Sequence, residues 1–165
     1  MKKTTQRDAF KIKATGNIAE KIVYNHYSKK HQVEINTDEF GYWDMKIDGA
    51  TVQVKAITPF VKFDCWAINE GKTTQNINNI FKCDRFLILS LPSRVPHEYD
   101  GYVLEVDPKE CMTKVLEGSF NPEKKISLVI PRNPAYIKKI FKITNEEEKN
   151  ILEHGTSIFR KKLTK

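Results

Sequence analysis

Apolar and polar residues alternate along positions 43–56, on both sides of the dipeptide Asp48-Gly49. Asp-Gly suits a two-residue type I′ hairpin turn, because both central residues of that turn take a positive φ. The pattern predicts an antiparallel hairpin in which apolar residues face apolar ones and polar residues face polar ones. The predicted pairs are Trp43 with Val54, Asp44 with Gln53, Met45 with Val52, Lys46 with Thr51, and Ile47 with Ala50.

The two faces of this predicted hairpin differ in chemistry. One face is apolar, as expected of a ribbon that packs on a core, and it consists of Trp43, Met45, Ile47, Val52, Val54 and Ala56. The other face carries Asp44, Gln53 and Lys55. A carboxylate, an amide oxygen and an ammonium group are therefore predicted to lie close together on the open face.

The rest of the pattern predicts helices and strands on both sides of the hairpin. Apolar residues recur at helical spacing over residues 15–27, and a short strand is expected near residues 32–35. After Pro59 we expect an extended segment, then a helix from 75 to 81 and a strand over the apolar run 85–91. Further strands are expected over 101–106 and 126–131, the latter at a sheet edge because Pro131 ends it. A last helix should begin at residue 144 or 145 and end in a basic turn at 160–162.

Length and composition limit the class of protein. The chain has 165 residues, which favours one domain over residues 1–165, and no apolar run approaches the length of a membrane span. Its basic start is not followed by the apolar segment of an export signal, so we expect it to act in the cytoplasm, of a host cell if it is virus-encoded. Cys65, Cys83 and Cys111 are odd in number and widely spaced, which predicts reduced thiols and neither disulfides nor a zinc site.

The net charge of +7 is unevenly distributed. Residues 1–31 hold eight Lys or Arg against two acids, and residues 135–165 hold eight against four, whereas the middle of the chain holds twelve against fifteen. Basic ends of this kind favour a polyanion such as nucleic acid as the partner. From charge alone, solvated helix faces explain these lysines equally well.

Asp44 followed by Gln53-Val54-Lys55 resembles the signature of the PD-(D/E)XK nuclease superfamily, an acid on one strand and then an acid, any residue and a lysine on the next. Gln53 replaces the second acid, as it does in some branches, and Trp43 stands where the family often has proline. The run from Gly16 to Glu20 resembles the first helix of many members, archaeal Holliday-junction resolvases among them, in which a Gly is followed after three residues by a Glu, and that Glu completes the metal site.

This resemblance implies a restriction-endonuclease-like α/β fold, with an αβββαβ core, a mixed central sheet flanked by helices, and a strand and a helix added at the C-terminus. It also implies a metal-dependent DNA endonuclease that hydrolyses phosphodiester bonds in recombination, repair, phage or restriction processes. Mg²⁺ is the expected cofactor, and Mn²⁺ should substitute for it. We expect a homodimer, because a single small site cuts one strand.

The resemblance also assigns roles to individual residues. Asp44 would be the central metal ligand, and Glu20 would bind the ion directly or through water. Gln53 would offer its amide oxygen and Val54 its carbonyl, while Lys55 would orient or deprotonate the attacking water. The catalytic set is therefore Glu20, Asp44, Gln53 and Lys55, and the candidates for contact with nucleic acid are Lys13, Lys46, Lys62, Gln75 and Lys82.

Other interpretations of the same residues stay open. Asp44 and Lys55 could form an ordinary ion pair on the surface of a hairpin. The aromatic residues Phe60, Phe63 and Trp66 could stack on bases, although their spacing favours a place in the core. At the level of the whole chain, the alternative is a catalytically weak or inactive nuclease-fold subunit that binds nucleic acid or joins a larger assembly.

Overall fold

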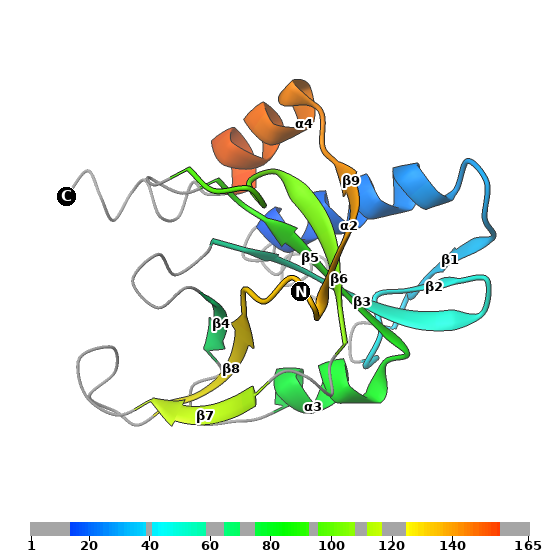
Figure 1. Ribbon diagram of the computed structural model, residues 1–165. Coiled ribbons are helices and arrows are strands. Elements are labelled where there is room, and N and C mark those ends of the chain that lie inside the picture. Colours follow the sequence, from blue (N-terminus) through cyan, green and yellow to red (C-terminus); the bar gives the residue numbers. More distant parts are fainter. Residues whose placement is uncertain are drawn as a thin grey trace, which may run out of the picture.

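The computed structural model describes residues 14–38, 41–58, 65–69, 75–92, 96–107, 112–116 and 125–155 (Figure 1). Its elements are, in chain order, α2 (Ala14–Tyr27), β1 (Val33–Ile35), β2 (Met45–Ile47), β3 (Ala50–Ile57), β4 (Cys65–Asn69), α3 (Gln75–Lys82), β5 (Arg85–Ser90), β6 (Tyr102–Val106), β7 (Met112–Leu116), β8 (Lys125–Pro131), β9 (Ile137–Lys142), α4 (Asn145–Asn150) and the π-helix η3 (Ile151–Gly155).

The described strands form two sheets. The larger has six strands in the order β1-β2-β3-β5-β6-β9, and the smaller has three in the order β4-β8-β7. In the larger sheet β3 and β5 run parallel, while β1–β2, β2–β3, β5–β6 and β6–β9 are antiparallel. The expected α/β class with a mixed central sheet is therefore confirmed.

The predicted hairpin forms around a tight turn at Asp48 and Gly49. Both residues have positive φ, +50° and +84°, as a type I′ turn requires. The register is the predicted one for the three pairs nearest the turn, which are Met45–Val52, Lys46–Thr51 and Ile47–Ala50. His31 and the main-chain N–H of Gln32 both bind the Asp48 carboxylate, at 2.6 Å and 3.0 Å, and so hold the turn against the connection between α2 and β1.

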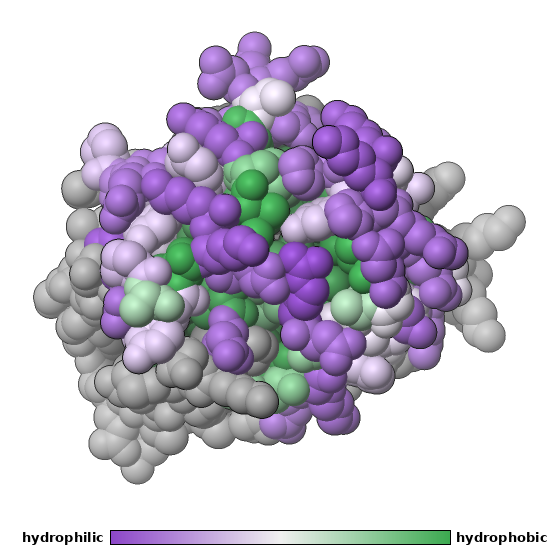
Figure 2. All heavy atoms as spheres, turned by 45° about the vertical axis from the view of Figure 1, so that its right-hand side comes forward, coloured by the Kyte–Doolittle hydropathy of each residue, from purple (hydrophilic) through white to green (hydrophobic). Residues whose placement is uncertain are grey.

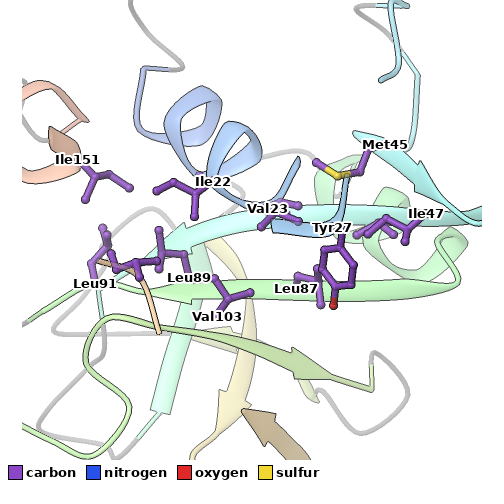
Figure 3. Packing of buried hydrophobic residues seen from close by; sticks show 14 residues of the cluster. Ile22, Val23, Tyr27, Met45, Ile47, Leu87, Leu89, Leu91, Val103 and Ile151 are labelled. Atoms are coloured by element: carbon purple, nitrogen blue, oxygen red, sulfur yellow. The ribbon is translucent and has the colours of Figure 1, made fainter. Parts of the chain in front are cut away.

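Helix α2 covers one face of the larger sheet and forms the first core with it. Figure 3 shows Ile22, Val23 and Tyr27 of α2 directed at the strands below, with Ile151 of η3 beside them. The strands contribute alternate residues to this core, namely Met45, Ile47, Val52, Val54, Leu87, Leu89 and Val103. The apolar face predicted for the hairpin thus packs against α2, except at its start.

The second core lies on the opposite face of the sheet, where α3 and the smaller sheet pack (Figure 1). Ile77 and Ile80 of α3 meet Phe86 and Ile88 of β5 there. Trp66 is fully buried in this cluster, and its indole N–H donates a hydrogen bond to Ser90. Trp66 is therefore a core residue, as its spacing favoured, whereas Phe60 and Phe63 lie outside the described residues.

Several expectations about elements need correction. Strand β8 is the central strand of its sheet, because β4 and β7 pair with its two sides and Pro131 occupies only its last position. Trp43 is not in the core with Met45, since β2 begins one residue after Asp44. The Trp43 ring instead packs under the Lys46 ammonium group, 4.9 Å from its centroid.

At the C-terminal side the structure agrees with the expected helix start. Thr144 caps α4 in a capping box with Glu147, each side chain accepting a hydrogen bond from the other residue's main-chain N–H. The basic turn expected at 160–162 and Cys111 lie outside the described residues, while Cys65 and Cys83 are buried free thiols as expected. None of the described helices is long and apolar enough to span a membrane.

Candidate functional site

The candidate site lies where β3 extends beyond its shorter neighbour β2. Strand β3 has eight residues and β2 has three, so the second half of β3 passes the start of β2. Asp44 fills this position. Its main-chain N–H donates to the Val52 carbonyl at 2.9 Å, and its carboxylate Oδ2 accepts from the Val54 N–H at 2.8 Å.

These two bonds correct the predicted pairing of Asp44 with Gln53, because Asp44 bonds to the residues on either side of Gln53. At Val54 the carboxylate accepts the hydrogen bond that a main-chain carbonyl of a neighbouring strand would otherwise accept. The N–H and C=O of one strand residue point to the same side, so the Val54 carbonyl points to this side as well. A carboxylate and a main-chain carbonyl are thus adjacent at the edge of β3.

Gln53 is buried beside this edge, with 6% of its surface exposed. Its side-chain Nε2 donates to the main-chain carbonyl of Tyr42 at 2.7 Å. The Cys83 thiol donates to the same oxygen at 3.3 Å. Because the amide nitrogen is bound to a carbonyl, the amide oxygen is the atom left to bind a cation or accept a hydrogen bond.

The connection between α3 and β5 holds Cys83 in place. Asp84 accepts hydrogen bonds from the main-chain N–H and the hydroxyl of Thr51, at 2.9 Å and 3.1 Å, and its own N–H donates to that hydroxyl at 3.0 Å. Burial and, to a smaller extent, the negative charge of Asp44 together raise the pKa of the Cys83 thiol to about 12. Cys83 is therefore a neutral thiol, close enough to Asp44 to sense its charge.

Gln53 and Lys55 share one face of the sheet, as expected. They pair with Phe86 and Ile88, which belong to the core beneath α3. Lys55 is half-buried and stands two residues beyond Gln53 on the same face. The amide and the ammonium group are thus on the α3 side of β3, next to the edge where Asp44 is bound.

Glu20 lies on the other side of the sheet, because it belongs to α2. Within that helix Val23 is fully buried against the sheet, and Glu20 and His26 lie about 60° to either side of it. His26 stacks on Phe141 of the edge strand β9, with ring centroids 3.7 Å apart. The flank with Glu20 must then face the opposite edge, toward β1 and β2.

The position of Glu20 along the helix axis is also set by its neighbours. Figure 3 shows Tyr27 near Ile47 and Ile22 near Leu89, so α2 runs antiparallel to β3. Glu20 lies about 3 Å further toward the start of α2 than Ile22, and hence beside the second half of β3. It is half-buried at the border of the apolar stripe, as expected. Glu20 therefore lies on the α2 side of the sheet, at the level of the second half of β3.

The residues expected to contact nucleic acid are only partly described. Lys46 is half-buried on β2, and Lys82 is exposed in the last turn of α3. Gln75 begins α3, but its side chain lies outside the described residues, as do Lys13 and Lys62. Figure 2 shows that hydrophilic side chains cover much of the face turned toward β1 and β2, with apolar side chains visible between them.

The donor atoms at this edge fit a hard cation. Among the described residues no three His, Cys, Asp or Glu side chains gather as a metal site. The expected ligand set contains only two residues of these types, Glu20 and Asp44. Its other two ligands are neutral oxygens, the side-chain amide oxygen of Gln53 and the main-chain carbonyl of Val54. Oxygen donors of this kind suit Mg²⁺ or Mn²⁺, and Mg²⁺ in proteins keeps several water ligands.

A pocket of about 390 Å³ adjoins the site at Cys83. Phe81, Asp84, Arg85, Glu105, Val106 and Asp107 line the rest of it. Two guanidinium nitrogens of Arg85 bind the two Glu105 carboxylate oxygens at 2.9 Å and 2.8 Å, and the Tyr27 hydroxyl accepts a further bond at 3.1 Å. This network holds the pKa of Arg85 above its usual range, mainly through its hydrogen bonds to Glu105.

Comparison of the chain with models of protein families, with curated proteins and with solved structures found no match. The interpretation of the site therefore depends on its residues and geometry. Sequence reasoning missed the Tyr42 carbonyl, Cys83 and the Thr51–Asp84 bonds. No sequence signal marks them, because a main-chain carbonyl is common to all residues and the three segments are far apart in the chain.

Proposed function

We propose that this chain is a divalent-metal-dependent endonuclease of the PD-(D/E)XK type that hydrolyses phosphodiester bonds in DNA. The observation that carries the proposal is the position of the Asp44 carboxylate, bound to the Val54 N–H at the edge of β3 just before β2 begins. It stands beside the Val54 carbonyl, and Gln53 and Lys55 follow on the adjoining face. An acid, an amide and a lysine at one strand edge form the minimal set for this chemistry.

The order of the elements supports the proposal. A helix precedes the three strands β1, β2 and β3, and α3 and the parallel strand β5 follow, with β4 inserted before α3. This order agrees with the αβββαβ core of restriction-endonuclease-like proteins. The strands β6 and β9 and the helix α4 then correspond to additions after that core.

The chain's own residues divide the work of hydrolysis. Asp44 and the Val54 carbonyl would hold Mg²⁺ from the edge of β3, the Gln53 amide oxygen would hold it from the α3 side, and Glu20 from the α2 side. The bound ion would supply charge neutralisation and an activated water. Lys55 would orient that water as an ammonium group or, as a neutral amine, take its proton; in either case the resulting positive charge would offset the negative charge that develops on the phosphoryl oxygens.

DNA as the substrate and a homodimer as the assembly belong to the same proposal. The basic ends of the chain supply charge for phosphate contacts, and Lys46 and Lys82 stand on the elements that flank the site. Two copies would place two sites on one duplex. The proposed site of action is the cytoplasm.

A second candidate function is a nuclease-fold module that binds nucleic acid or joins an assembly without cutting. The neutral amide of Gln53 favours it, because an acid at this position would give the site one more negative charge and a higher affinity for a cation. Calorimetric titration with Mn²⁺ separates the two, since a module of this second kind would bind DNA in a salt-dependent manner without binding the ion.

The test of the proposed activity is cleavage of plasmid, branched and single-stranded DNA with and without Mn²⁺. Asp44→Asn should abolish Mn²⁺-dependent cleavage and Lys55→Met should reduce it by about two orders of magnitude or more, and both should leave the fold intact. Glu34→Gln changes an exposed acid outside the site and should cut like the wild type. Cleavage that persists in both site variants would show that the activity comes from elsewhere.

A further inference from the structure

The surroundings of Gln53 explain why this chain has an amide at a position where an acid is expected. Gln53 is one of the few buried polar side chains among the described residues. Its nitrogen lies 2.7 Å from the Tyr42 carbonyl, and a carbonyl can only accept a hydrogen bond. A carboxylate at position 53 would place two hydrogen-bond acceptors next to each other. It would also add a negative charge close to that of Asp44.

The Tyr42 carbonyl is itself fixed by a second donor. The Cys83 thiol reaches the same oxygen from the end of α3, and the bonds between Thr51 and Asp84 hold that segment against β3. Two donors on one carbonyl satisfy both of its lone pairs and restrict its direction. The amide of Gln53 therefore binds to an oxygen that cannot turn away.

We propose that the Tyr42 main-chain carbonyl, together with the Cys83 thiol, is the positioning group of this site: it binds the Gln53 amide nitrogen and leaves the amide oxygen as a neutral ligand for a hard divalent cation. The second half of this inference rests on the proposed function. The first half, the fixed amide, stands independently of it. Cys83 acts only through Tyr42 and Gln53 and is not itself a ligand.

The inference predicts a distinct signature for the side-chain amide of Gln53 in nuclear magnetic resonance spectra. In protein labelled with ¹³C and ¹⁵N its NH₂ protons should exchange with water about tenfold more slowly than those of the exposed Gln32. Loss of the resonance in Gln53→Met assigns it. Addition of Mg²⁺ should shift the ¹³Cδ resonance of Gln53 and leave the slow exchange of its NH₂ protons unchanged.

Substitution of Cys83 tests the second donor with a matched pair. Cys83→Ala removes the donor, and we expect NH₂ exchange at Gln53 to quicken about threefold and Mg²⁺ affinity to fall by a similar factor. Cys83→Ser retains a donor and should restore both toward the wild-type values. Equal behaviour of the alanine and serine variants would remove Cys83 from the positioning group.

The outcomes separate this inference from the proposed function. If the NH₂ protons of Gln53 exchange slowly but its ¹³Cδ resonance does not shift with Mg²⁺, the result would support the fixed amide and contradict the cation site. Exchange at Gln53 as fast as at Gln32 would overturn the positioning role, whatever the protein does with Mg²⁺. If Mg²⁺ shifts the resonances of Asp44 but not the ¹³Cδ resonance of Gln53, the metal site stands and the amide oxygen is not one of its ligands.

Discussion

Gln53→Glu should destabilise the metal-free protein, although the new side chain has almost the same shape. The change removes the donor that lies 2.7 Å from the Tyr42 carbonyl and puts a carboxylate into a position that is 6% exposed. The variant loses a buried hydrogen bond and leaves two acceptor oxygens facing each other, which lowers the free energy of unfolding by roughly 2 kcal/mol. For a chain of this size, that corresponds to a fall in Tm of roughly 4–8 °C.

The same variant should respond more strongly to metal than the wild type. A carboxylate at position 53 adds one negative charge next to Asp44, so a bound cation removes a repulsion that the wild type lacks. A ligand that binds the folded state at 100 times its Kd stabilises it by about 2.7 kcal/mol. We therefore expect Mn²⁺ to raise the Tm of Gln53→Glu by more degrees than that of the wild type.

The assay is thermal unfolding followed by circular dichroism, with and without Mn²⁺, at neutral and acid pH. At acid pH a protonated carboxyl group at position 53 can donate to the Tyr42 carbonyl, so the difference from the wild type should shrink. Gln32→Glu makes the same chemical change at an exposed position and should shift the Tm little. A metal-free Gln53→Glu protein as stable as the wild type at neutral pH would refute the geometry argued for Gln53.

The hairpin and the catalytic lysine give three further predictions. Gly49→Ala should lower stability by roughly 1–2 kcal/mol through its positive φ alone, since no atom lies within 4 Å of the added Cβ, and Gly49→Asn should cost less in the same denaturant titration. The pKa of Asp48 is lowered by its hydrogen bond from His31, so its contribution to stability is present above the ordinary pKa of 3.8 and disappears as the pH falls below it. Asp48→Asn should therefore have a lower Tm than the wild type at neutral pH and an equal one in acid; a constant difference across pH would contradict this. Lys55→Met should reduce cleavage by about two orders of magnitude or more and leave Mn²⁺ binding intact by calorimetry, whereas loss of binding would make Lys55 a structural residue.

The hairpin was predictable because its determinants are local. The turn dipeptide Asp48-Gly49 fixes the register, and alternation decides which side chains face the core. The prediction failed at its outer end, where Asp44 leaves the ladder and binds Val54 through its side chain. The alternation of apolar and polar residues does not show where a side-chain carboxylate binds a main-chain N–H in place of a neighbouring strand, because that depends on how far β2 extends.

Elements fixed by distant contacts were harder to predict. Strand β9 was missed because its apolar residues Ile137, Ile140 and Phe141 do not alternate, and its pairing with β6 shifts register between Val103 and Leu104. The edge position expected for β8 was wrong, because β4 and β7 come from separate parts of the chain.

The position of Glu20 relative to Asp44 was predictable only in part. The helical wheel predicted correctly that Glu20 borders the apolar stripe. Which edge of the sheet it faces depends on the stacking of His26 on Phe141, a contact between residues more than a hundred positions apart. Sequence alone therefore suggested candidate residues for the site, while the face of the sheet on which each one lies required the fold.

The central claim is that Glu20, Asp44, Gln53 and Lys55 surround one divalent cation, and paramagnetic broadening by Mn²⁺ tests it most directly. In ¹⁵N-labelled protein, substoichiometric Mn²⁺ should broaden the amide resonances of these residues and of Val54 first, and Asp44→Asn should abolish the effect. Broadening centred instead on the acidic first turn of α4, Glu146–Glu148, or unchanged by Asp44→Asn, would contradict the account.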